Sequence, residues 1–133
     1  MGQNHEYQCE GHFLITKHIV PLMKQQKSGH ILTIASDVSK RTFAEGSVYC
    51  ASKYSQDALM SSLRKEVREF KVKVSLVYPG LVDTNFGDST QGEPQKSNWL
   101  KTKDIADSVL YILNTPTNVV IDELTIHPIE QEY

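Results

Sequence analysis

Cysteine is scarce in this sequence, and long apolar runs and an excess of either charge are missing. The two cysteines, Cys9 and Cys50, do not form a disulfide framework and favour a reducing, cytoplasmic location. No apolar run reaches the length of a transmembrane span, and the polar segment 1–10 lacks the pattern of a signal peptide. The formal net charge is −2 with both signs interspersed, which favours neither nucleic acid nor a membrane as a partner.

Several motifs are also absent. The seven glycines are never two residues apart, so the G-x-G turn that brings a backbone close to a pyrophosphate is missing. No G-x-S-x-G motif marks a hydrolase nucleophile. The five histidines lack metal-ligand spacing, so we expect no metal site and interpret them as structural or surface residues.

Two segments have the apolar periodicity of amphipathic helices. The first covers residues 11–27, where Pro21 is expected to kink the helix without ending it. The second covers residues 47–70. Residues 1–10 show no such periodicity and are expected to be a loose lead-in.

Short apolar segments alternate with these helices. Residues 30–35, 72–78 and 119–126 are predicted strands, and a further helix begins at residues 102–104, between the second and third strands. This alternation predicts an α/β fold with a parallel sheet, right-handed crossovers and helices on both faces. Ligands of such sheets bind at the carboxyl ends of the strands.

A hydroxyl, a phenol and an ammonium group are expected to meet at that edge. Ser36 follows the first strand, and Tyr49 and Lys53 are four residues apart in the second helix, so they share one face. A phenol with a pKa of about 10 is a poor acid or base at neutral pH, and a nearby positive charge favours its ionised form. Because Pro79 and Gly80 end the next strand at the same edge, the sequence predicts a proton-transfer site there.

This arrangement resembles the catalytic Ser and Tyr-x-x-x-Lys set of the short-chain dehydrogenase/reductase family. The resemblance extends to S-G-H-I-L-T-I-A-S upstream and to V-K-V-S-L-V-Y-P-G-L-V-D-T downstream, and it covers about residues 11–128. It implies one truncated Rossmann-like domain over residues 1–133, with a doubly wound parallel sheet of about three strands and flanking helices.

The resemblance also implies roles for individual residues. Tyr49 would be the proton donor or acceptor, Lys53 would lower the pKa of the phenol and bind the nicotinamide ribose, and Ser36 would orient the substrate oxygen. The implied activity is carbonyl reduction or alcohol oxidation of a small molecule with NADP or NAD, of which NADP is favoured. The nicotinamide end of the cofactor would be contacted by four further residues, Pro79, Gly80, Val82 and Thr84.

Further expectations concern the rest of the chain. Gln8 stands at the position of a family asparagine and is a candidate member of the proton relay. Residues 85–101 are expected to form a mobile substrate lid, in which Phe86 and Trp99 are either lid residues or ordinary packing residues. In the family, the helices that match 11–27 and 47–70 pack against a second subunit, which implies a homodimer or homotetramer.

The family's glycine-rich nucleotide-binding half is not found in this sequence. Without it, the strand 30–35 loses a neighbour, and we expect an exposed apolar edge that recruits another chain. Two functions are therefore open. The chain is an oxidoreductase whose phosphate-binding half comes from another polypeptide, or it is a truncated non-catalytic homologue that only oligomerises or associates with another chain.

Overall fold

Three parallel strands form one sheet in the order β1-β2-β3. The computed structural model describes the backbone of residues 2–132 and the side chains of residues 9–132. The strands are β1 (Gly29–Ile34), β2 (Val72–Pro79) and β3 (Glu123–Ile126). This arrangement confirms the predicted α/β class and the three-stranded parallel sheet.

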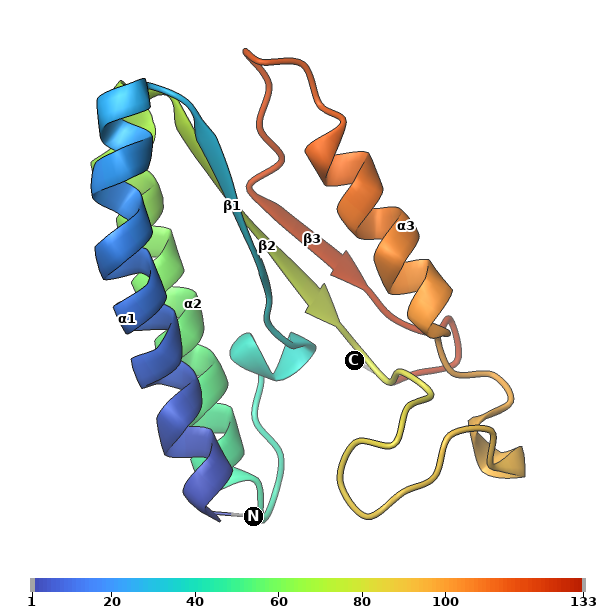
Figure 1. The fold of residues 1–133 in the computed structure, drawn as a ribbon. Coiled ribbons are helices and arrows are strands. Elements are labelled where there is room, and N and C mark those ends of the chain that lie inside the picture. Colours follow the sequence, from blue (N-terminus) through green and yellow to red (C-terminus); the bar gives the residue numbers. More distant parts are fainter. Residues whose placement is uncertain (1, 133) are drawn as a thin grey trace.

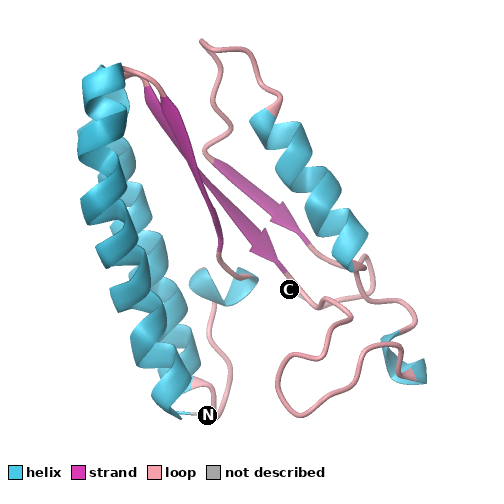
Figure 2. Ribbon diagram, in the orientation of Figure 1, coloured by secondary structure: helices cyan, strands magenta, loops and turns pink. Residues whose placement is uncertain are grey.

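Helices cover both faces of the sheet (Figures 1 and 2). Helices α1 (Gly2–Gln26) and α2 (Ser47–Val67) pack together on one face, and α3 (Thr102–Leu113) lies on the other. At the start of α3, the Asp104 carboxylate accepts a hydrogen bond from the backbone N–H of Lys101 at 2.7 Å. This contact caps the positive end of the helix.

The two crossovers of the sheet have opposite hands. The chain advances in one direction, from β1 through β2 to β3, while α2 and α3 lie on opposite faces. The expectation of right-handed crossovers is therefore wrong for one of the two. Lys73 holds the end of α3 on its face, because its ammonium donates to the carbonyl of Pro116 at 2.7 Å.

Two predicted boundaries are corrected. Helix α1 begins at Gly2, so the expected lead-in of residues 1–10 is helical from its second residue. Adding a turn to an existing helix costs little, and no proline or turn pair interrupts this segment. Strand β3 begins at Glu123, four residues later than predicted, because its pairing with β2 starts at Leu76.

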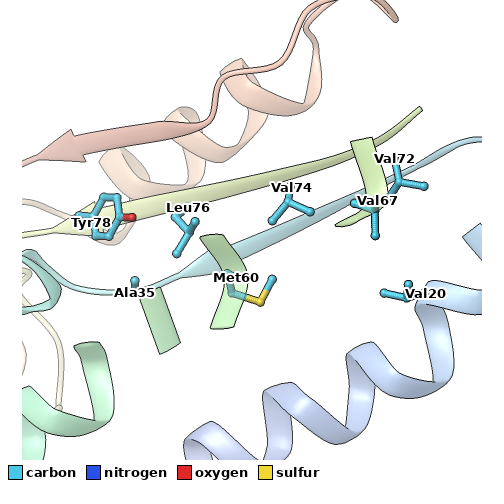
Figure 3. Packing of buried hydrophobic residues seen from close by; sticks show 8 residues of the cluster. All are labelled: Val20, Ala35, Met60, Val67, Val72, Val74, Leu76 and Tyr78. Atoms are coloured by element: carbon cyan, nitrogen blue, oxygen red, sulfur yellow. The ribbon is translucent and has the colours of Figure 1, made fainter. Parts of the chain in front are cut away.

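The hydrophobic core lies between β2 and the pair α1–α2 (Figure 3). Alternate side chains of β2 point toward the helices, and Met60 of α2 is completely buried against them. The cluster of buried side chains consists of Val20, Ala35, Met60, Val67, Val72, Val74, Leu76 and Tyr78. Burial of this apolar surface supplies most of the free energy that holds α2 on the sheet.

Apolar surface is exposed on the side of β1 and α1. Within residues 2–132, β1 pairs only with β2, which confirms the expected unpaired edge. Ile34 at the end of β1 is 41% exposed, and α1 exposes Phe13, Leu14, Ile15, Ile19 and Leu22. Among the described residues, no helix has both the length and the apolar character needed to cross a membrane.

We expect Met60→Ala to lower the free energy of unfolding by about 2–5 kcal/mol, because it removes a fully buried side chain and leaves a cavity. Urea denaturation followed by circular dichroism measures this change. Tyr111→Ala on α3 is the control, since Tyr111 is 67% exposed and its loss should change stability by about 0.5 kcal/mol or less. Equal effects of the two substitutions would contradict the assigned core.

Acid should destabilise the fold through His30. Burial and the nearby Lys73 ammonium lower the pKa of His30 below its ordinary value of 6.5, and its Nε2 lies 2.7 Å from Ser75 Oγ. His30 therefore binds a proton more readily in the unfolded chain than in the folded one. Its contribution to the free energy of unfolding is present above pH 6.5 and is lost as the pH falls. Urea midpoints measured from neutral to acidic pH should fall less steeply for His30→Gln than for the wild type, whereas exposed His18→Gln should follow the wild type.

Candidate active site

A cavity of about 790 Å³ opens at the carboxyl ends of β1 and β2. Figure 1 shows this end of the sheet, with the loop that follows β2 and the C-terminal segment beside it. Its position agrees with the general rule for parallel sheets. The predicted site residues that line it are Ser36, Tyr49, Lys53, Pro79, Gly80, Val82 and Thr84.

The chain fixes Ser36 at the end of β1. Its backbone is extended, with φ −163° and ψ 157°, and it caps the short 3₁₀ helix Asp37–Ser39. The Ser36 Oγ accepts a hydrogen bond from the Val38 N–H at 3.4 Å and donates to Asp37 Oδ1 at 3.2 Å. A serine is favoured at such a cap because its hydroxyl satisfies a free backbone N–H. The same contacts hold the hydroxyl at the cavity wall.

Tyr49 lies in the first turn of α2 and is hydrogen-bonded to Ser36. Burial raises the pKa of Tyr49, and the hydrogen bond with Ser36 offsets only part of this effect. The expected lowering of the phenol's pKa by Lys53 is therefore not found. Because desolvation disfavours the phenolate, Tyr49 is protonated at neutral pH, which is the form that donates a proton.

Lys53 lies one turn further along α2 and is almost completely buried, with 8% of its surface exposed. Its Nζ lies 5.9 Å from the centroid of the Tyr49 ring and donates to Gln56 Oε1 at 3.4 Å. Burial lowers the pKa of Lys53. The hydroxyl, the phenol and the ammonium therefore line one cavity, as their spacing in the sequence predicts, and the role of each remains a prediction.

The turn after β2 forms the opposite wall. Gly80 donates its N–H to Ile126 O at 2.8 Å, and Val82 pairs with Leu100 in an isolated bridge. The Thr84 Oγ1 accepts a hydrogen bond from the Phe86 N–H at 3.2 Å. Gln8, the remaining candidate, falls within α1, and its side chain lies outside those that the structure describes.

Three polar residues of the cavity were missed in the sequence. Asp37, only 4% exposed, accepts hydrogen bonds from Arg41 Nη2 at 2.6 Å and from Gln131 Nε2 at 2.7 Å. The Oε1 of Gln131 in turn accepts a hydrogen bond from the Leu81 N–H at 2.9 Å. A side chain on Gly80 would collide with this amide, because a Cβ there would lie 2.2 Å from Gln131 Oε1.

Asp37, Arg41 and Gln131 differ in whether a local sequence pattern could have identified them. Asp37 and Arg41 are four residues apart, a spacing that pairs opposite charges within one turn. Gln131 lies 94 residues from Asp37, so no local pattern could have found it.

Aromatic rings close one side of the cavity. Phe43 and Phe86 flank Tyr49, with ring centroids 6.5 and 6.1 Å from it. The loop that carries Phe86 is organised around the ammonium of Lys96, which is 1% exposed, and its expected mobility stays a prediction. A buried cation needs several acceptors. Lys96 Nζ finds them within the loop, at Thr84 O, Ser89 Oγ and Thr90 O.

The chain is similar to known proteins of one family. The family model described as short chain dehydrogenase matches residues 4–95. An uncharacterized oxidoreductase of Staphylococcus epidermidis is 36% identical over 121 residues, which are 90% of this chain and 51% of that protein. One from Staphylococcus saprophyticus is 36% identical over 112 residues, 84% of this chain and 47% of that protein. The chain thus spans about half the length of these relatives.

Solved structures agree with this likeness. Serine dehydrogenase from Escherichia coli superimposes with a TM-score of 0.79 at 27% identity, covering 93% of this chain and 51% of that one. The alcohol dehydrogenase of the archaeon Thermococcus sibiricus, complexed with 5-hydroxy-NADP, also has a TM-score of 0.79, at 31% identity over 89% of this chain and 49% of that one. By the matched range and these relatives, the chain belongs to the short-chain dehydrogenase family.

Proposed function

We propose that this chain carries the proton-transfer part of an NAD(P)-dependent oxidoreductase that interconverts carbonyl and alcohol groups of a small molecule. The observation that supports this most directly is the convergence of Ser36, Tyr49 and Lys53 on one cavity of about 790 Å³. Membership of an oxidoreductase family supports the same reaction class. The proposal includes a cytoplasmic location, which the free thiols of Cys9 and Cys50 support.

The residues at the cavity suit the nicotinamide end of a cofactor. The Leu81 N–H and the Asp37 carboxylate already hold a primary carboxamide, that of Gln131, with the N–H bound to its oxygen and the carboxylate bound to its nitrogen. Nicotinamide carries the same group, so a donor and an acceptor of the right kind are available beside Gly80. The residues proposed to contact this end of the cofactor are Pro79, Gly80, Val82 and Thr84.

In the proposed reaction, the nicotinamide cofactor supplies or accepts the hydride when it is bound. Tyr49 gives its phenolic proton to the substrate carbonyl oxygen in reduction and takes a proton from the alcohol in oxidation. Ser36 hydrogen-bonds the same oxygen and aligns it with the phenol. Lys53 stabilises the phenolate that forms after the transfer and binds the ribose hydroxyls.

NADP is the favoured cofactor of the proposal, and two solved relatives were crystallised with NADP-type ligands. The G-x-G turn that binds a pyrophosphate is absent from this chain, so the phosphate-binding part has to come from outside it. Residues 85–101 are proposed to contact the substrate, with Phe86 and Trp99 at the cavity wall.

A second function is favoured by the exposed apolar surfaces of β1 and α1. Ile15 and Leu22 of α1 are 61% and 63% exposed, an unusual exposure for branched apolar side chains. A truncated, non-catalytic homologue that associates through these surfaces would have the same fold. In either case we propose that α1 and α2 form the contact of a homodimer or homotetramer.

Titration with NADPH and NADH, followed by the fluorescence of the reduced cofactor, separates the two functions. The oxidoreductase should bind saturably, and it should turn over members of a panel of small ketones and aldehydes. Tyr49→Phe should keep cofactor binding and lose roughly 10²–10⁴-fold in turnover, because the proton donor is removed while the ring remains.

Tyr111→Phe is the matched control, since Tyr111 is exposed on α3 away from the cavity, and it should retain full turnover. Unchanged turnover in Tyr49→Phe would refute the assigned proton donor. No saturable binding by the wild-type chain would refute an oxidoreductase that acts without a phosphate-binding part from outside the chain.

The oligomeric contact is tested separately by light scattering at micromolar concentration. The wild type should have at least the mass of a dimer, and Ile15→Glu should shift it toward the 15.0 kDa monomer, because a charge cannot be buried in an apolar contact. Lys17→Glu changes an exposed polar position of the same helix and should leave the mass unchanged. A monomeric wild type would contradict the proposed contact.

A further inference from the structure

A line of polar side chains leads from the cavity into the contact between α2 and α1. Lys53 Nζ donates to Gln56 Oε1 at 3.4 Å, and Gln56 Nε2 lies 2.8 Å from Nε2 of His12 on α1. Gln56 is only 2% exposed, so both ends of its amide depend on these protein partners. Polar groups this deeply buried are costly unless they are hydrogen-bonded, and both ends of this amide are.

The chemistry of Lys53, Gln56 and His12 determines which group donates and which accepts in each of these hydrogen bonds. An ammonium has donors only, so the amide oxygen of Gln56 has to face Lys53. The amide NH₂ then faces His12, and His12 accepts through the unprotonated Nε2 of a neutral imidazole. Each group therefore has one compatible orientation, and a reversed amide would place two donors against the ammonium.

Lys53 depends on this acceptor. Its side chain has four rotatable bonds, and its pKa is lowered by burial, so the charged form is stabilised only by groups close to Nζ. Among the side chains that the structure describes, Gln56 is the one hydrogen-bond acceptor of Lys53. Its other close neighbour is the Tyr49 ring, whose centroid is 5.9 Å away.

We propose that Gln56 and His12 are positioning residues of the site: His12 fixes the amide of Gln56, and the amide oxygen holds the Lys53 ammonium beside Tyr49. The proposal rests on the proposed function, because the direction of the ammonium matters to chemistry only if Lys53 acts on a phenol and a cofactor. The proposed role of His12 means that α1 contributes to the site, since His12 reaches Gln56 only when α1 packs on α2.

Nuclear magnetic resonance of the whole chain, labelled in its lysine side chains, tests this without cofactor or substrate. The Lys53 signal is identified by its loss in Lys53→Arg and is then titrated. Gln56→Leu should lower the pKa of Lys53 below the wild-type value, because the acceptor is lost. Gln56→Glu should raise it above the wild-type value, because a carboxylate replaces the amide.

His12→Phe should lower the pKa of Lys53 in the same direction as Gln56→Leu. It should also speed hydrogen exchange of the Gln56 side-chain NH₂ by about tenfold, the loss expected for one hydrogen bond. His18→Phe on the exposed face of α1 and Gln25→Leu at an exposed position should change neither quantity.

One result would overturn the proposal: the pKa of Lys53 is the same in the wild type, Gln56→Leu and Gln56→Glu. The amide spectra of both variants have to show an intact fold. The opposite shifts of the two Gln56 variants would not result from a merely structural role. Because the samples contain no cofactor, the Lys53 shifts are read independently of turnover: the expected shifts together with unchanged turnover in Tyr49→Phe would contradict the proposed function and leave the positioning role intact.

Discussion

The parallel pairing of β1 with β2 is the constraint on which the site depends. Its register sets Ile34 opposite Val77, and the Ala35 N–H donates to Val77 O at 2.8 Å. Ser36 and the Pro79–Gly80 turn therefore leave the sheet side by side. Because α2 packs its buried Met60 on the same two strands, its first turn lies at this edge as well. A shift of one residue in the register would turn Ser36 to the other face.

Burial determines the electrostatics of the cavity. It raises the pKa of Tyr49 and lowers that of Lys53, so each group is moved toward its neutral form. The hydrogen bond between Tyr49 and Ser36 offsets part of the shift of the phenol, and the Lys53 ammonium donates to Gln56 Oε1 at 3.4 Å. The site thus holds a protonated phenol beside a weakly compensated cation, an arrangement suited to a ligand that brings its own acceptors.

The unpaired edge of β1 and the exposed side of α1 are apolar surfaces of a chain that spans about half the length of its relatives. The chain covers 51% of its relative from Staphylococcus epidermidis, and within residues 2–132 no strand pairs with the outer edge of β1, where Ile34 is 41% exposed. In the proposed function, proton transfer uses residues of this chain, whereas the cofactor phosphates would bind outside it.

The sequence by itself determined those features that depend on neighbours within one or two turns. The four-residue spacing of Tyr49 and Lys53 and the alternation of strands and helices are local patterns, and the predicted α/β sheet follows from that alternation. Helix α1 was predicted in kind but not in extent, because helix propagation through polar residues leaves no apolar period to read.

Only the tertiary structure decided which distant groups complete the cavity. His12 meets Gln56 across 44 positions, and Gln131 meets Asp37 across 94. The face on which α3 packs, and with it the hand of the second crossover, was decided in the same way. Such contacts depend on how helices and strands pack in three dimensions, and a pattern with a period of two or 3.6 residues carries no information about them.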